Sequence, residues 1–224
     1  ADVVTKEAIE ELIIMSQQKP LLDDINSDVN HLKTLLDGCF LLGELSNRTS
    51  DRIMGFGELL SSQIIAKAME QKVPNSGYKD SREIMKTNNH FGKAVVNFEL
   101  SNQLIKDYFN SNTNRITVLP GFIASSTDGY STTLGRGGSD YTAAILAGAL
   151  NAELLEIWTD VSGMFTANPK IVKQAQPIET ISYQEAMELS HFGAKVLYPP
   201  TIQPILKLNI PRNWFCHRSI LSPN

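Results

Sequence analysis

An alternation of short β-rich runs with helical stretches limits the fold of this chain more than any other feature of its sequence. Runs rich in β-branched residues predict strands at residues 94–98, 115–119 and 154–159. The periodicity between these runs predicts helices at residues 99–110 and 139–151. Strands that alternate with helices typically form a parallel sheet covered by helices. The sequence therefore predicts an α/β fold.

The first third of the chain has a purely helical pattern. Apolar residues at three- and four-residue spacings predict helices at residues 6–15, 31–45 and 51–71, and Asp28 is a candidate cap of the second helix. A Pro-Asn-Ser-Gly sequence at residues 74–77 ends this pattern, since it combines residues typical of turns. The chain thus changes from helical to mixed character at this turn.

The remaining pattern contains neither an internal repeat nor a linker. Helical stretches at residues 182–190 and 200–208 continue the alternation toward the C-terminus. One α/β domain is the simplest organisation of such a chain. We expect it to comprise residues 1–211, with a mostly helical part at 1–73, an α/β core for nucleotide and substrate at 74–211, and an atypical tail at 212–224.

Composition excludes several classes of protein. Hydrophobic residues make up 42% of the 224 residues and charged residues 20%, as in ordinary globular domains, so disorder is not expected. The net charge of −4 argues against a nucleic-acid partner. The longest nearly apolar run, residues 143–150, is far shorter than the roughly 20 residues that span a bilayer, and the N-terminus does not resemble a signal peptide. These features predict a cytoplasmic protein without a membrane partner.

Cysteine and histidine give no sign of a metal site. The two cysteines and four histidines have no spacing typical of metal ligands. Cys39 lies in an apolar stretch at residues 38–42, which favours a buried free thiol.

A glycine-rich loop is the first place where chemistry is expected. Ligands of open parallel sheets bind at the carboxyl ends of the strands. The loop at residues 131–142 reads Ser-Thr-Thr-Leu-Gly-Arg-Gly-Gly-Ser-Asp-Tyr-Thr and precedes a helix of small apolar residues. Its glycines allow a ligand to approach the backbone, the helix amides can hold an anion, and Arg136 can clamp a carboxylate or phosphate. The alternative is a flexible loop with an ordinary helix cap.

A second candidate segment follows the strand predicted at residues 154–159. Thr159 and Asp160 stand at its carboxyl end, where a hydroxyl and a carboxylate can bind the polar edges of a base or ribose. Phe165 can pack on an apolar face of a nucleotide, and Lys170 can reach phosphate. A Pro/Gly turn with a solvated lysine explains this segment equally well, and the same ambiguity applies to Lys195 behind a glycine.

Taken together, four segments resemble the successive signatures of the amino-acid kinase family, and within it those of the aspartate kinases. They are Gly-Phe-Ile at 121–123, the loop at 132–142, Trp158 to Pro169, and Phe192 to Leu197. A Gly-Glu-Leu-Leu-Ser sequence at 57–61 is similar to the family's substrate-binding helix. The resemblance extends from about Leu32 to Pro211. Within this range the chain is most similar to the kinase half of bifunctional aspartate kinase/homoserine dehydrogenases.

This resemblance implies a fold and a reaction. The fold would be a three-layer α/β/α sandwich with a mainly parallel sheet. The reaction would transfer the γ-phosphate of ATP, with Mg²⁺, to the side-chain carboxylate of L-aspartate. The product, 4-phospho-L-aspartate, would enter lysine, threonine and methionine biosynthesis, and the enzyme would be a homo-oligomer.

Family positions can be carried over residue by residue. Glu58 would bind the ammonium group of aspartate and Arg136 its α-carboxylate, a chemically sensible pairing because an amino acid presents one cation and one carboxylate. Phe122 and Ser139 would complete the pocket, and Asp140 would organise the charged groups around the transferred phosphoryl group. The positions that contact ATP would be Thr159, Asp160, Phe165, Lys170 and Lys195.

The chain also departs from the family pattern. Phe165 replaces a usual Tyr and Lys170 a usual Arg, so we expect somewhat weaker ATP binding. The family's first strand, with its Lys-Phe-Gly-Gly-Thr-Ser loop, does not occur in these 224 residues, and neither do regulatory domains. Because that lysine lies beside the phosphates in the family, we expect little turnover from the chain as given. After Pro211 the resemblance ends.

Other functions remain open at this stage. The motifs of P-loop kinases and protein kinases do not occur in the sequence. A different amino-acid kinase could act on glutamate, acetylglutamate or a nucleoside monophosphate, although Glu58 and Arg136 favour a free amino acid. A catalytically silent fragment that binds only a ligand or a partner subunit is the alternative from another class.

Overall fold

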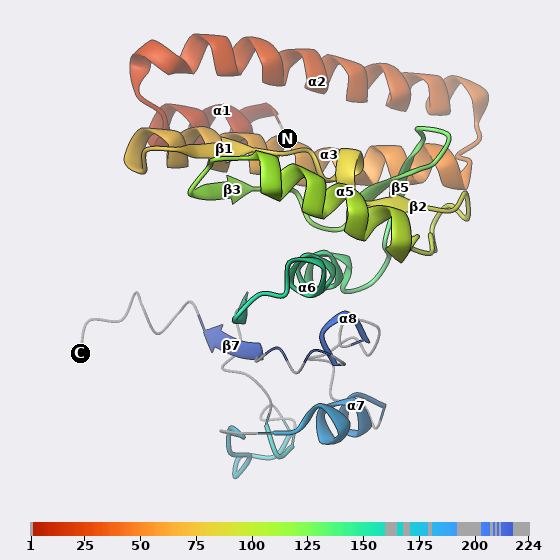
Figure 1. Cartoon of the computed structure of the whole chain (residues 1–224). Coiled ribbons are helices and arrows are strands. Elements are labelled where there is room, and N and C mark those ends of the chain that lie inside the picture. The colour runs from red at the N-terminus through yellow and green to blue at the C-terminus, as the bar shows by residue number, and fades with distance from the viewer. Residues whose placement is uncertain are drawn as a thin grey trace. The chain divides into compact units, whose positions relative to one another are not determined.

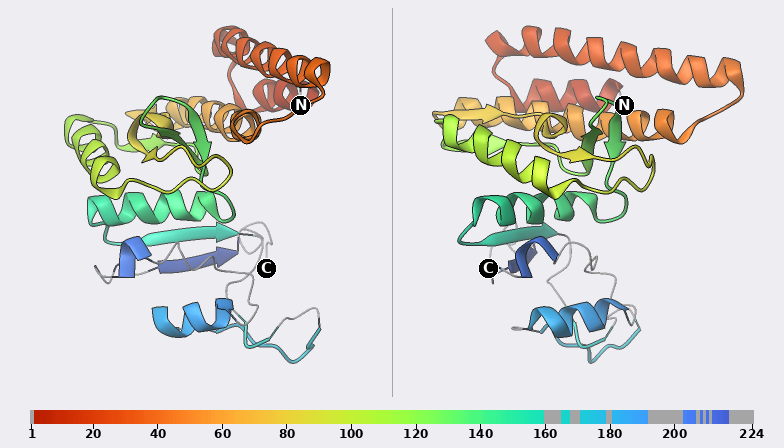
Figure 2. Two further views of the ribbon diagram at one scale, coloured as in Figure 1. Left: turned by 90° about the vertical axis from the view of Figure 1, so that its right-hand side faces the viewer. Right: turned by 45° about the vertical axis from the view of Figure 1, so that its right-hand side comes forward.

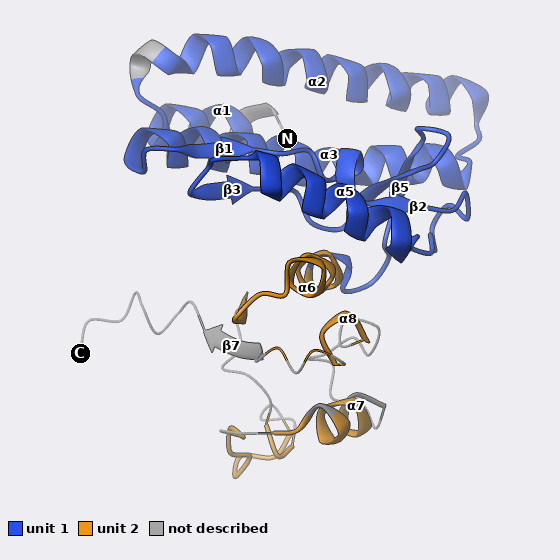
Figure 3. Cartoon of the chain, in the orientation of Figure 1, with its two compact units in different colours: residues 1–139 blue, residues 140–224 orange. Residues whose placement is uncertain are grey.

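The structure, a computed structural model, consists of two compact units, residues 1–139 and 140–224 (Figure 3). It describes residues 2–159, 165–167, 171–178, 181–191, 203–206, 208, 210 and 212–216.

The first unit combines a helical layer with short strands (Figure 1). Its helices are α1 (Asp2–Leu12), α2 (Met15–Leu42), α3 (Asn47–Lys72), α4 (Ser81–Ile84) and α5 (Phe98–Ser111). Its strands are β1 (Ser76–Tyr78), β2 (Lys86–Thr87), β3 (Ile116–Val118), β4 (Ile123–Ser126) and β5 (Ser131–Thr133). The strands lie between α3 on one side and α5 on the other (Figure 2).

Helices α1, α2 and α3 pack through an apolar cluster. Six buried side chains form it, two from each helix: Ile9, Ile13, Leu21, Ile25, Leu60 and Ile64, where Ile13 directly follows α1. The prediction that Asp28 caps a helix starting near residue 31 was wrong, because α2 already begins at Met15. Asp28 instead accepts a hydrogen bond from Gln63 of α3 at 3.2 Å, and this bond supplements the apolar contact between the two helices.

The C-terminal end of α2 lies outside this cluster. Phe40, Leu41 and Leu42 are 86%, 82% and 80% exposed, and Cys39 is a free, half-buried thiol. The free thiol predicted at Cys39 is confirmed, but its predicted burial was wrong, since the residue is only partly buried. The reason is that α2 contributes to the cluster only through its first half, so that its last turns have no apolar neighbour there.

Helix α3 begins four residues earlier than expected. Ser46 caps it, because its Oγ accepts a hydrogen bond from the backbone N–H of Thr49 at 3.2 Å. The helix then runs without interruption to Lys72, just before the predicted break at residues 74–77. A capped α3 of this length reaches across both sheets of the first unit.

The strands of the first unit form two small sheets, β1–β3 and β2–β4–β5. The pairs β1–β3 and β2–β4 are parallel, whereas β4–β5 is antiparallel. The strand predicted at residues 94–98 was wrong, since Val96 makes only an isolated bridge to Thr87. Asn97 explains the difference, because its side chain accepts from Leu100 N at 3.1 Å and caps α5.

The second unit has its own apolar core. Its elements are most of α6 (Gly138–Leu150), β6 (Leu155–Thr159), α7 (Tyr183–His191), α8 (Gln203–Leu206) and β7 (Arg212–Cys216). The buried side chains of this core are Ala144, Ala147, Leu155, Ile157, Ile205 and Ile210. Strand β7 pairs in parallel with β6, so residues 212–216 of the predicted tail form a two-stranded sheet with β6. None of the described helices could cross a membrane.

Close packing of α6 on α8 gives a first prediction. A Cβ at Gly148 would lie 2.6 Å from the carbonyl oxygen of Pro204, a backbone atom that cannot easily move. Gly148→Ala should therefore lower the free energy of unfolding by about 1–3 kcal/mol, the usual range for overpacking. At Gly38 in α2, no atom of the described residues lies within 4 Å of such a Cβ, so Gly38→Ala should raise the free energy of unfolding by about 0.5–1 kcal/mol. Urea unfolding of the two variants measures both effects, and equal shifts would contradict the assigned contact.

Candidate active site

The glycine-rich loop forms a tight turn that presents Arg136. Gly138 N donates to the carbonyl oxygen of Gly135 at 3.0 Å and closes the turn. Gly135 and Gly137 have φ angles of +72° and +67°, which side chains with a Cβ rarely adopt. Arg136 is exposed between them, and no described residue forms a hydrogen bond or ion pair with its guanidinium. The turn therefore exposes a guanidinium group that can bind an anionic ligand.

The segments that carry Phe122 and Ser139 lie against each other beside this turn. Leu134 N donates to the carbonyl oxygen of Phe122 at 2.8 Å. A Cβ at Gly121 would lie 2.9 Å from both Cα and Cβ of Ser139, so the two segments touch. Phe122 itself has a φ of +68°, an uncommon value for a residue with a large side chain. Such strain is found preferentially at functional sites.

Helix α3 presents one face to the sheet that leads into the turn. Asp51, Gly55 and Glu58 are spaced four and three residues apart and therefore share a face of the helix. At Gly55 the helix lies close to β4, since a Cβ there would be 3.2 Å from Cγ2 of Ile123. Glu58, one turn further along, belongs to the same face, which places it on the side of the helix toward β4 and β5.

Glu58 is a half-buried carboxyl group without a counterion. Burial raises its pKa above the ordinary value, because a charged carboxylate is poorly solvated there. No described residue donates a hydrogen bond to its side chain or pairs with it. A cationic ligand would stabilise the charged form of such a desolvated, unpaired carboxylate.

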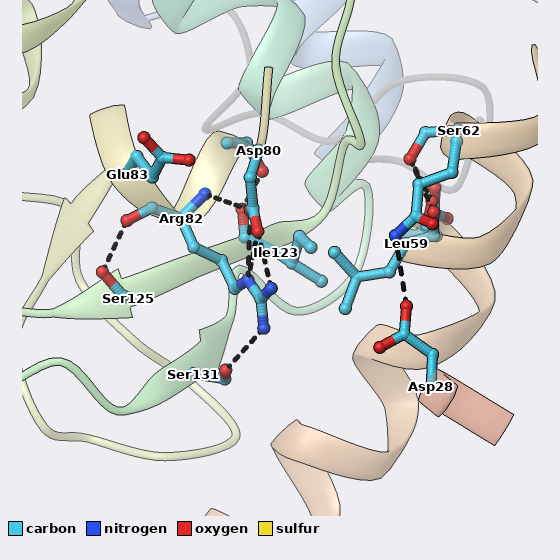
Figure 4. A network of polar contacts seen from close by, with 12 residues as sticks. Asp28, Leu59, Ser62, Asp80, Arg82, Glu83, Ile123, Ser125 and Ser131 are labelled. Carbon is cyan, nitrogen blue, oxygen red and sulfur yellow. Dashed lines mark hydrogen bonds and ion pairs between the residues drawn. The ribbon is translucent and has the colours of Figure 1, made fainter. Parts of the chain in front are cut away.

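A polar network braces the start of β5 (Figure 4). Arg82 forms a fork on Asp80, with Nη2 2.6 Å from Oδ2, and its Nη1 donates to Ser131 Oγ at 3.2 Å. The hydroxyl of Ser125 donates to the carbonyl oxygen of Arg82 at 2.6 Å. The hydrogen bonds to Asp80 raise the pKa of the Arg82 guanidinium. This network ties together α4, β4 and the first residue of β5, the strand that leads into the turn.

The predicted nucleotide residues lie in the second unit, and the structure describes few of them. Thr159 ends β6, and Phe165 is half-buried and forms a bridge to Pro177. Asp140 follows Ser139 in the first turn of α6 and has an interaction partner. The remaining predicted positions, Asp160, Lys170 and Lys195, lie outside the described residues.

Among the described residues no group of three or more His, Cys, Asp or Glu could hold a metal ion. Mg²⁺ in phosphoryl-transfer sites is held largely by substrate phosphates and one or two carboxylates.

Asp51 was missed as a candidate in the sequence analysis, where it marked only the start of a helix. It is 1% exposed and accepts three hydrogen bonds. Its position seven residues before Glu58 was a usable signal, because that spacing puts both carboxyl groups on one helix face.

The comparisons with known proteins identify the class to which this fold and site belong. The model of the amino acid kinase family matches residues 4–211. The chain belongs to the amino acid kinase family, and the α/β fold predicted from the sequence is confirmed.

Within the family, the relatives are aspartokinases. A bifunctional aspartokinase/homoserine dehydrogenase 1 of Arabidopsis thaliana is 37% identical over 188 residues, which are 84% of this chain and 21% of that protein. Lysine-sensitive aspartokinase 3 of Escherichia coli is 37% identical over 186 residues, 80% of this chain and 41% of that protein. The chain thus spans less than half the length of these relatives.

A solved structure gives the same result. The crystal structure of E. coli aspartokinase III in complex with aspartate and ADP matches with a TM-score of 0.83 and 33% identity, covering 92% of this chain and 45% of that one. The resemblance to aspartate kinases stated from the sequence is confirmed.

Proposed function

We propose that the chain is the kinase part of an aspartate kinase that forms 4-phospho-L-aspartate from L-aspartate and ATP. One observation carries this proposal: neither Glu58 nor Arg136 has a partner among the described residues. Glu58 lies on α3, which packs against β5, and Arg136 lies in the turn that follows β5. An unpaired carboxylate can bind the ammonium group of a free amino acid, and an unpaired guanidinium can bind its α-carboxylate. The aspartokinase relatives support the same substrate.

Each residue has a defined task in the proposed reaction. Glu58 holds the ammonium group, and Arg136 holds the α-carboxylate by two parallel hydrogen bonds. Phe122 and Ser139 limit the pocket, so that the side-chain carboxylate points toward ATP. An oxygen of that carboxylate forms a bond to the γ-phosphorus while the bond from this phosphorus to the ADP oxygen breaks.

The chain's other contribution is electrostatic. Asp140 organises the charged groups near the transferred phosphoryl group, and ATP is bound by Thr159, Asp160, Phe165, Lys170 and Lys195. Mg²⁺ bound with ATP would neutralise phosphate charge. The product would supply lysine, threonine and methionine biosynthesis. A cytoplasmic location and assembly into a homo-oligomer are further parts of this proposal.

Trapping of the acyl phosphate with hydroxylamine tests the proposal directly. The purified chain is incubated with ATP, Mg²⁺ and L-aspartate, and calorimetry measures binding of each substrate separately. Hydroxamate formation that depends on aspartate supports the proposal. Transfer to glutamate, acetylglutamate or a nucleoside monophosphate instead would identify another amino-acid kinase. Selective binding of aspartate and ATP with only slow transfer agrees with the low turnover predicted from the sequence and supports the proposal. Binding of both substrates with no transfer at all would identify a silent ligand-binding chain.

A further inference from the structure

Asp51 connects three segments that are distant in the sequence. Its Oδ1 accepts from the hydroxyl of Thr133 at 2.8 Å. Its Oδ2 accepts from Thr133 N at 3.2 Å and from Gly92 N at 2.9 Å. A single buried carboxyl group thus links α3, the end of β5 and the loop before α5. Buried polar groups with all these bonds are costly to disrupt.

Thr133 is the last residue of β5, three positions before Arg136. Arg136 is flanked by Gly135 and Gly137, both in the left-handed region, and glycines on either side restrict its backbone only weakly. Its position is therefore determined by its anchors. These are Thr133, held by Asp51, and the pair formed by Leu134 N and the carbonyl oxygen of Phe122 at 2.8 Å.

Asp51, which holds Thr133, lies on α3, the helix that also carries Glu58. Asp51 lies two turns before Glu58 on the same face of α3. The ammonium and α-carboxylate of an amino acid are separated by a fixed, short distance. A site that recognises both must therefore hold its acid and its base at a matching separation.

We infer that Asp51 is a positioning residue that sets the distance between Glu58 on α3 and Arg136 on the glycine turn. This inference rests on the proposed function. It predicts selective damage when the link is cut: aspartate binding weakens, while ATP binding is unchanged, because the predicted ATP residues lie in the other unit.

Two pairs of variants test the inference. Asp51→Ala removes all three hydrogen bonds, whereas Asp51→Asn can accept from the two N–H groups and donate to the threonine hydroxyl. Thr133→Val removes one bond, whereas Thr133→Ser retains it. The matched control is Thr132→Val, which removes an equally buried hydroxyl on the same strand that bonds to Thr87 at 2.8 Å instead of Asp51.

Calorimetry with aspartate and ATP gives the first measurement, and hydrogen exchange of residues 133–138 gives the second. Asp51→Ala and Thr133→Val should weaken aspartate binding about tenfold, the effect of losing roughly one hydrogen bond, and should speed up exchange. Asp51→Asn, Thr133→Ser and Thr132→Val should bind aspartate like the parent chain.

The inference is overturned if Thr132→Val weakens aspartate binding as much as Thr133→Val, since the role would then be structural only. It is also overturned if Asp51→Ala leaves binding or exchange unchanged. A parent chain that binds no aspartate would reject the proposed function together with this role. That failure differs from the others because it is seen before any substitution is made.

Discussion

Arg136→Lys should weaken aspartate binding by about 1.5–3 kcal/mol, or roughly 10–150-fold, because a lysine replaces a forked pair of charge-assisted hydrogen bonds by a single point charge. The side chain is exposed on its turn and no described residue pairs with it, so the substitution removes no bond that stabilises the fold. Calorimetry with aspartate and with ATP measures the effect, and ATP binding should stay within about twofold of the parent.

Arg115→Lys is the matched control for this prediction. Arg115 is likewise exposed and lies in the first unit, just before β3. The Arg115→Lys variant should bind aspartate and ATP with the affinities of the parent chain. Equal weakening of aspartate and ATP binding by Arg136→Lys would indicate a disturbed loop. Unchanged aspartate binding would remove Arg136 from the site.

The turn around Arg136 shows what local sequence can predict. Closely spaced glycines beside an arginine indicated backbone approach to an anion, and the structure gives two of these glycines positive φ angles. The helical first third was also predictable, since its apolar spacing follows directly from helix geometry. These features depend on neighbouring residues only.

Features that depend on distant residues could not be predicted. The five-residue run at 94–98 has the composition of a strand, but Asn97 caps α5 and the backbone turns away. Strand β4 is buried at every position, so it lacks the alternation that marks a half-buried strand. Phe40, Leu41 and Leu42 are apolar yet exposed, because the described contacts of α2 in the apolar cluster come from residues nearer its start. Tertiary context outweighed local pattern in each case.

The same limit applies to Asp51. In the sequence it is one more acid at the start of a helix. Its burial and its bonds to Thr133, 82 residues later, follow from the packing of α3 on β5. The seven-residue spacing already indicates that Asp51 and Glu58 share a helix face, but only the folded chain shows that Asp51 is an anchor for Thr133 and Gly92.

Glu58→Gln should change aspartate binding and stability in opposite directions. The ammonium of aspartate loses its charged partner, so binding should weaken by about 1.5–3 kcal/mol, the value of a hydrogen bond to a charged group. The free chain, in contrast, should become more stable at pH 7. Burial raises the pKa of Glu58 in the folded state above its ordinary value, so folding at neutral pH places an unfavourable charge in this position.

The pH dependence has a definite sign. A raised folded pKa contributes stability that is complete below the ordinary value of the unfolded chain and is lost as the pH rises through the folded pKa. The stability gained by Glu58→Gln should therefore be largest at neutral pH and vanish near pH 4, measured by thermal unfolding at both values. Glu44→Gln, a change of an exposed acid between α2 and α3, should show neither effect.

The affinity of the parent chain for aspartate should depend on the protonation state of Glu58. Protonation of Glu58 removes the charge that attracts the ammonium, so affinity should fall as the pH decreases through the raised pKa, at a higher pH than an ordinary glutamate would give. In Glu58→Gln this dependence should disappear, because the amide does not titrate. A variant that binds aspartate weakly yet retains the full pH dependence would show that another group holds the ammonium, and that the half-buried acid on α3 serves a different purpose.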